Sequence, residues 1–272
     1  MIAIFKKVQI LYIIAGFSGL AVVCAVTTPF DYGVNTIGFW VFLLTIVFWL
    51  FFCAHIASFF AAKELNKIIE LVTNECAPRR CIDALVPLLA NAKREDVRRY
   101  ILLQIATRYF DCGEFEKCRE HLSFFPAYQP ANSGMKALNN ALQYCTLVAY
   151  SFATHNMPQA EHGLQCLQQE LQNKYLGKNI KTHIENLYTQ RRLRLQIAKG
   201  QYDEAMQVFQ RIFDVGSLYE RVTADYILAD ILSATGKPDE ARQALQYVIE
   251  HGNELHLVQE AQRKLAERQR AE

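Results

Sequence analysis

Two long apolar stretches near the N-terminus, neither with a charged residue, constrain the fold of this chain most. They comprise residues 8–26 and 37–62, and the short segment between them contains Pro29, Gly33 and Asn35. A helix of about 20 apolar residues, rising about 1.5 Å per residue, is long enough to cross a bilayer. Pro, Gly and Asn favour a tight turn. The two stretches therefore predict a transmembrane helical hairpin over residues 1–62.

Basic residues lie at the two outer ends of this predicted hairpin, which would be on the same side of the membrane. Lys6 and Lys7 precede the first stretch, Lys63 and Lys67 follow the second, and the connecting segment carries Asp31 but no Lys or Arg. Basic flanks of membrane helices tend to remain in the cytoplasm. We therefore expect a multi-pass protein of the cell membrane with both termini in the cytoplasm, in contact with the lipid bilayer through two transmembrane helices.

Residues 63–272 predict an all-α region. Their apolar residues recur with helical periodicity, and Gly, Pro or Asn interrupts the pattern at short intervals. The predicted breaks lie near residues 77–78, 112–113, 126–134, 155–158, 177, 200, 216, 236–238 and 252–253. We expect a juxtamembrane helical connector at 63–92 and a cytoplasmic domain of antiparallel helix pairs at 93–272.

Four of these breaks share a short turn pattern. It reads GEFEKC at 113–118, GQYDEA at 200–205 and GKPDEA at 236–241, with a weaker version, HNMPQA, at 155–160. Gly favours the end of a helix, acidic residues stabilise the start of the next, and a small residue allows close helix packing. The pattern predicts repeated helical hairpins. A non-repeat bundle that shares generic turn chemistry is the alternative.

These turns resemble those of the tetratricopeptide repeat family, whose repeat unit has about 34 residues. The first and last units match the family pattern best, at Ile105, Ala106, Tyr109, Gly113, Phe115 and Leu122, and at Leu228, Ala229, Gly236, Ala241 and Leu245. Two other units match at fewer positions, namely Leu147, Val148, Ala160 and Leu164, and Gly200, Tyr202, Ala205 and Phe209. The resemblance covers about residues 95–250 and implies an α-solenoid, which a helix at 255–268 would cap.

The chain departs from the family pattern at three positions. Cys118 replaces the small Ala, Pro238 replaces an aromatic residue, and Arg192 stands where an apolar residue is expected. For Arg192, a register shifted by one residue is the alternative. The small position recurs after 42, 45 and 36 residues, so the units are longer than the family's.

No motif of an enzyme, a cofactor site or a metal centre is recognisable in the sequence. GxSxG, HExxH, GxGxxG, the P-loop and CxxC are all missing. Among eight cysteines, Cys76 and Cys81 are five apart and Cys112 and Cys118 are six apart, wider than in most structural zinc sites. We predict no catalysis, no cofactor and no metal, with the cysteines packed in the core. The net charge of +2 argues against nucleic-acid binding.

The resemblance implies protein binding, so we predict a membrane-anchored scaffold or adaptor. A groove along the first helix of each pair would hold a protein or peptide partner. From the helix register, the partner-binding residues are expected to be Arg108, Asn140, Tyr144, Arg191, Arg194 and Asp225. Two alternatives remain: an accessory subunit whose hairpin packs into a larger membrane complex, and a cysteine-based metal or redox sensor.

Overall fold

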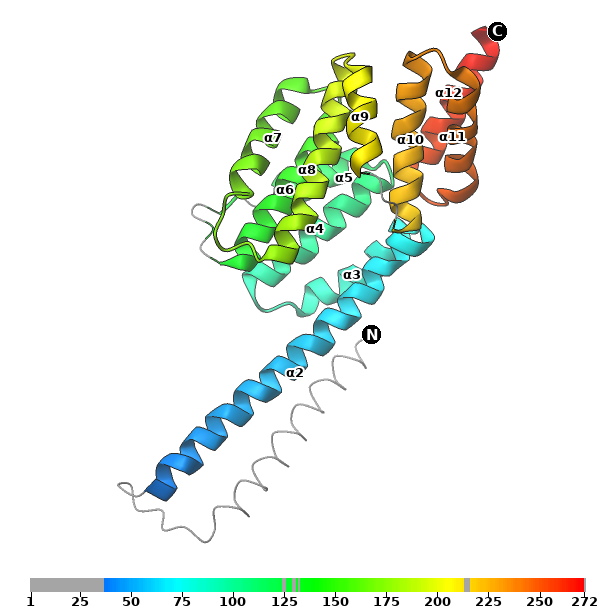
Figure 1. The fold of residues 1–272 in the computed structure, drawn as a ribbon. Helices are drawn as coiled ribbons and strands as arrows, with labels where there is room; N and C mark the ends of the chain where they lie inside the picture. The colour runs from blue at the N-terminus through cyan, green and yellow to red at the C-terminus, as the bar shows by residue number, and fades with distance from the viewer. Residues whose placement is uncertain (1–36, 124–125, 129–130, 132, 213–215, 272) are drawn as a thin grey trace. The chain divides into compact units, whose positions relative to one another are not determined.

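The computed structural model describes residues 37–123, 126–128, 131, 133–212 and 216–271 (Figure 1). All regular secondary structure in these residues is helical, which confirms the predicted all-α class. The chain divides into two compact units, Met1–Ile68 and Ile69–Glu272, and each is described by itself.

In the first unit, the described residues belong to helix α2 (Ile37–Glu75), which contains the second apolar stretch. Large apolar side chains are exposed along it, with 66% of Leu44, 70% of Phe48 and 66% of Phe51 accessible to solvent. The rings of Trp49 and Phe52 pack with their centroids 5.5 Å apart. The helix thus carries an apolar surface over several turns.

The predicted membrane topology requires a correction. In the described part of the chain, no helix combines the length and the apolarity that crossing a membrane demands. The first predicted span, 8–26, lies outside the described residues. The predicted multi-pass localisation in the cell membrane, with both termini cytoplasmic, is therefore wrong, and the predicted transmembrane hairpin loses its support.

The second unit is a succession of helix pairs that follows a single helix, α3 (Pro78–Asn91). The pairs are α4 (Glu95–Asp111) with α5 (Phe115–Ser123), α6 (Gly134–Ala153) with α7 (Met157–Glu170), α8 (Lys178–Ala198) with α9 (Tyr202–Ile212), and α10 (Leu218–Ala234) with α11 (Pro238–His251). A last helix, α12 (His256–Ala271), packs on α10 and α11. The first helix of each pair contacts the first helix of the next, so α4, α6, α8 and α10 form one row, the first-helix row (Figure 1).

The turns within the pairs share one backbone geometry. Gly113, Gly200 and Gly236 have φ angles of 77°, 74° and 77°, and His155 takes the same place in the weaker turn with a φ of 55°. In each turn the next amide donates to the carbonyl five residues earlier: Glu114 to Tyr109, Asn156 to Ser151, Gln201 to Gln196 and Lys237 to Leu232. This is the Schellman cap, in which a left-handed residue ends the helix.

Small residues follow each turn where the two helices of a pair meet. Cys118, Ala160, Ala205 and Ala241 are all fully buried. In α8, Leu193 is fully buried whereas Arg192 is exposed. The alternative of a register shifted by one residue is therefore correct for Arg192, and Leu193 takes the packed position.

The C-terminal helices also contact the beginning of the second unit. Cys76 belongs to the same apolar core as Val222, Leu245 and Leu255. The amide of Glu254 donates to the carbonyl of Cys76 at 3.2 Å, and a hydrogen bond of 2.8 Å joins the Asn253 side chain to the carbonyl of Glu75. The end of α11 and the start of α12 therefore lie against the segment between α2 and α3.

Candidate functional site

Three of the six predicted partner-binding residues gather around Tyr219 at the start of α10. Arg108 comes from α4, and Arg191 and Arg194 come from α8. The guanidinium carbon of Arg108 is 6.0 Å from the centroid of the Tyr219 ring. The positive charges of Arg108 and Arg191 lie close enough to the Tyr219 hydroxyl to lower its pKa, and Tyr219 lies close enough to Arg194 to raise the pKa of that guanidinium. We call Arg108, Arg191 and Arg194 the arginine cluster.

The carboxylate of Asp111 is the direct ionic partner of this cluster. It accepts a hydrogen bond of 2.7 Å from Nη1 of Arg108, three residues earlier on α4, and one of 2.9 Å from the Tyr219 hydroxyl. Only 3% of Asp111 is exposed. Each carboxylate oxygen therefore has a donor, as a buried charge requires.

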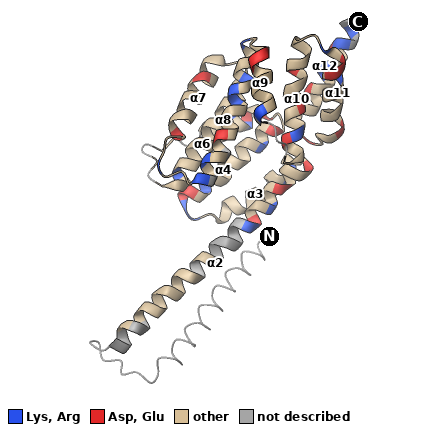
Figure 2. Cartoon of the chain, viewed as in Figure 1, with Lys and Arg blue, Asp and Glu red and all other residues tan. Residues whose placement is uncertain are grey.

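Burial and neighbouring negative charge shift the pKa values of the arginines in opposite directions. Burial lowers the pKa of Arg108, but Asp111 and Tyr219 raise that pKa overall. The pKa of Arg194 is lowered, first by burial and then by the neighbouring charge of Arg191. Burial raises the pKa of Tyr219, and Asp111 raises it further, so its hydroxyl stays protonated. The cluster is thus a local excess of positive charge in a unit where both signs are otherwise interspersed (Figure 2).

The arginine side chains have unused hydrogen-bonding capacity. The Nε atoms of Arg108, Arg191 and Arg194 are all buried and meet no acceptor among the residues that the structure describes. Arg194 also packs its guanidinium carbon 5.9 Å from the centroid of the Tyr226 ring, a cation–π arrangement. A planar guanidinium suits bidentate contact with a carboxylate or a phosphate.

His256, the first residue of α12, closes the site from the C-terminal side. Its Nδ1 donates to the backbone carbonyl of Asp111 at 3.1 Å, and its ring lies 5.4 Å from Phe110 and 5.6 Å from Phe115. Burial lowers the pKa of His256, and the charge of Arg194 lowers it further. The imidazole is therefore neutral at pH 7 and adds no charge to the cluster.

Two other predicted residues, Asn140 and Tyr144, lie on α6 close to α7. The Asn140 side chain accepts from the amide of Tyr128 at 2.8 Å and donates to the carbonyl of Tyr128 at 3.0 Å. It also donates to Oε2 of Glu170 at 3.2 Å. Burial raises the pKa of Tyr144, and Cys166 and Glu170 add to the effect. Asn140 therefore anchors the segment before α6 within the chain.

The sixth predicted residue, Asp225, is half-buried on α10. Burial raises its pKa, while the charges of Arg221 and His251 lower it. The charged groups that act on Asp225 thus lie on α10 and α11. The structure therefore brings together Arg108, Arg191 and Arg194, and leaves the other three predicted residues in two separate places.

The cysteines of the second unit are mostly buried thiols. Burial raises the pKa of Cys76, Cys81 and Cys112 to about 11, and that of Cys118 and Cys145 to about 12. These five thiols are protonated at neutral pH, and a thiol reacts and binds metals as the thiolate. In the residues open to description, no group of three or more His, Cys, Asp or Glu side chains is arranged to hold a metal ion.

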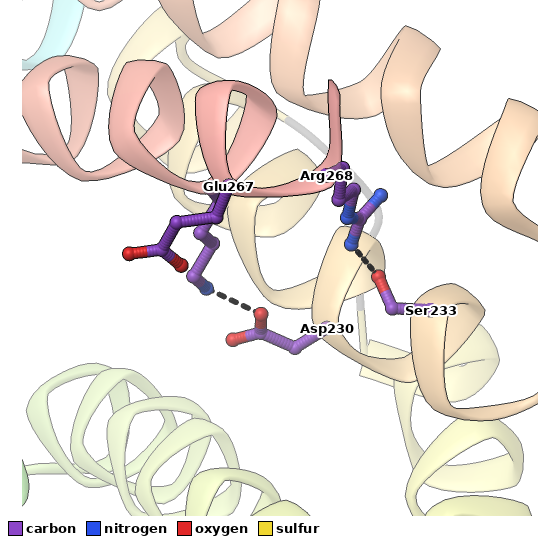
Figure 3. A pocket seen from close by; sticks show the side chains of 5 residues that line it. Asp230, Ser233, Glu267 and Arg268 are labelled. Atoms are coloured by element: carbon purple, nitrogen blue, oxygen red, sulfur yellow. Dashed lines mark hydrogen bonds and ion pairs between the residues drawn. The ribbon is translucent and has the colours of Figure 1, made fainter. Parts of the chain in front are cut away.

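An open pocket of about 360 Å³ lies between α10 and α12, lined by Asp230, Ser233, Lys264, Glu267 and Arg268 (Figure 3). Lys264 is paired with Asp230, and Arg268 donates to the hydroxyl of Ser233. Two basic and two acidic side chains line it, so their formal charges cancel. The pocket therefore offers less electrostatic selectivity than the arginine cluster.

The sequence interpretation missed four residues of this site, Asp111, Tyr219, Tyr226 and His256. Arg108 and Asp111 are three apart on one helix, and that spacing alone predicts an ion pair. Tyr219 is 108 residues from Asp111, and no local pattern indicates such a contact.

No family model, curated protein or solved structure matches this chain. A proposal for its function therefore depends on the chain's own residues and their geometry.

Proposed function

We propose that the chain is a tetratricopeptide-like interaction protein, without catalysis, whose first-helix row binds a segment of a partner protein. The observation that carries this proposal is the convergence of Arg108, Arg191 and Arg194 around Tyr219. Residues from α4, α8 and α10 meet there although they are far apart in the sequence. A row of helices that gathers charged donors in this way suits recognition of an acidic segment of a protein.

The turn geometry supports the repeat assignment. Four Schellman turns, each followed by a fully buried small residue, recur through the helix pairs. A helix that ends the stack, such as α12, supplies the cap that solenoids need. Five protonated thiols give no support to the cysteine-based sensor.

A test of the proposal compares two charge reversals on the same helix of the full chain. Arg191→Glu with Arg194→Glu alters the cluster, whereas Arg192→Glu alters an exposed position beside it. Cross-linking in cells followed by mass spectrometry identifies partners of each variant, and purified candidates are then titrated directly. We expect a partner that the Arg192→Glu variant retains and the double variant loses. Identical partners for both variants would contradict the proposal.

The exposed apolar residues of α2 favour a second candidate function, a subunit of a larger assembly. Leu44, Phe48 and Phe51 recur at helical spacing and are more than half exposed. Exposed apolar patches of this kind often mark association surfaces. Replacing the three by Gln should change the size of the native assembly, measured by light scattering. An unchanged size would reject this candidate.

A further inference from the structure

The arginine cluster holds more positive charge than the described residues around it balance. Among the described residues, the ion pair of the cluster is the one between Arg108 and Asp111, so the charges of Arg191 and Arg194, which lie near Tyr219, have no carboxylate paired with them. Asp230 also acts on Arg194, but its carboxylate is already paired with Lys264. The buried imidazole of His256 is neutral.

The donors of the cluster come from fixed positions. Arg191 and Arg194 are three residues apart, so both project from the same face of α8. Asp111 holds the Arg108 guanidinium on α4 and also accepts from the hydroxyl of Tyr219, whose ring lies beside Arg108. The hydroxyl of Tyr219 and both terminal nitrogens of Arg108 are already used, because Nη1 donates to Asp111 and Nη2 donates to Gln104. The donors left for a ligand are therefore mainly those of Arg191 and Arg194.

We propose that the arginine cluster binds a phosphoryl group, which carries close to two negative charges at neutral pH and three acceptor oxygens. Such a dianion balances the two excess charges, whereas one carboxylate leaves one of them unbalanced. A guanidinium group can donate two parallel N–H hydrogen bonds to the oxygens of one phosphate, whereas a lysine ammonium has no such planar pair of donors. This inference deepens the proposed function and rests on it, since the phosphoryl group would belong to a phosphorylated side chain of the partner protein. A free phosphate ion offers the same chemistry.

The experiment is a calorimetric titration of the purified full chain at constant ionic strength. The probes are inorganic phosphate, a phosphoserine peptide, and the same peptide without the phosphoryl group. Arg191→Gln with Arg194→Gln removes two donors, and Arg192→Gln is the matched control on the exposed side of α8. Circular dichroism establishes that each variant keeps its helices. If the double Gln variant unfolds, Arg191→Lys with Arg194→Lys keeps the charge and removes the planar pair of donors.

We expect saturable binding of the phosphorylated probes, weakened at least about tenfold by the double Gln or double Lys variant and unchanged by Arg192→Gln. Tighter binding of the phosphopeptide than of inorganic phosphate would assign the phosphoryl group to a protein partner, and equal affinities would assign it to the free ion. The inference would be overturned if the wild-type chain bound neither inorganic phosphate nor the phosphoserine peptide. It would also be overturned if Arg192→Gln weakened binding as much as the double variant does. Treating the cross-linked partner with phosphatase separates the proposed binding of a partner protein from the proposed phosphoryl site. Binding that survives this treatment preserves the proposed function and removes the phosphoryl site.

Discussion

His256 donates from Nδ1 to the backbone carbonyl of Asp111 at 3.1 Å and so joins the last helix of the chain to the end of α4. The same aspartate accepts from Arg108 and Tyr219 through its side chain. One residue at a helix end thus connects α4, α10 and α12. His256 also packs between the rings of Phe110 and Phe115, so the docking of α12 helps to hold the end of α4.

This docking should weaken in acid. The pKa of His256 is lowered by burial from its ordinary value of 6.5. A group whose pKa is lower in the folded state contributes stability above its unfolded pKa and loses it as the pH falls through the folded pKa. We therefore expect the free energy of unfolding to decrease below pH 6.5. Urea titrations above and below that pH measure it. His256→Gln should flatten the profile, whereas His162→Gln, at an exposed position, should leave it unchanged.

Replacing His155 by Gly should stabilise the protein. His155 is exposed and holds a φ of 55°, a conformation that costs an L-residue with a side chain about 1 kcal/mol. Glycine removes this strain but adds freedom to the unfolded chain, so we expect a net gain of about 0.5 kcal/mol. Thermal unfolding followed by circular dichroism measures the change. A lower melting temperature would show that the His155 side chain makes a compensating contact.

The reverse change at Gly236 should destabilise the protein through the backbone alone. Gly236 has a φ of 77°, and a Cβ added there would meet nothing within 4 Å. Gly236→Ala therefore introduces strain without a clash, and we expect a loss of roughly 1 kcal/mol. The matched control is Lys237→Ala, an exposed neighbour whose φ of −116° allows any L-residue. Equal stability of Gly236→Ala and wild type would contradict the strain argument.

The helix pairs could be predicted because their ends depend on local chemistry. Gly113, Gly200 and Gly236 mark left-handed caps that few other residues adopt, and each lies at a helix end in the structure. The break between α3 and α4 was not among the predicted helix breaks, because residues 92–94 contain neither Gly nor Pro, although the predicted boundary between connector and domain falls there. Arg192 lies eight residues before the turn at Gly200, and at that distance an error of one residue rotates the expected packed face by about 100°.

The candidate site was predictable only in part. Arg191 and Arg194 stand out as a basic run on one helix, and Arg108 follows from the register of another. Their meeting around Tyr219 depends on how α8 and α10 pack, which no short pattern determines. The hydrogen bonds of Asn140 to Tyr128 likewise depend on the path of the chain before α6.

Removing the Tyr219 hydroxyl should cost stability although the ring remains. In Tyr219→Phe, Oδ1 of Asp111 loses its 2.9 Å hydrogen bond while the carboxylate stays buried. A hydrogen bond to a charged group contributes about 1.5–3 kcal/mol, and we expect a loss in that range. Urea denaturation measures it. Tyr175→Phe, at a position 44% exposed, should change the free energy of unfolding far less. Comparable losses in both variants would mean that the hydroxyl of Tyr219 has no special role.

The buried thiols should make the protein unstable in alkali. The pKa of Cys118 and Cys145 rises from 9.0 to about 12, and that of Cys81 to about 11, chiefly through burial. A group whose pKa is higher in the folded state contributes stability below its unfolded pKa and loses it as the pH rises through the folded pKa. The free energy of unfolding should therefore fall between pH 9 and pH 12. Urea titrations across this interval measure the slope, and Cys118→Ala should reduce it, because Ala fits the small position and carries no thiol. An unchanged slope in Cys118→Ala would show that this thiol does not contribute to the alkaline loss.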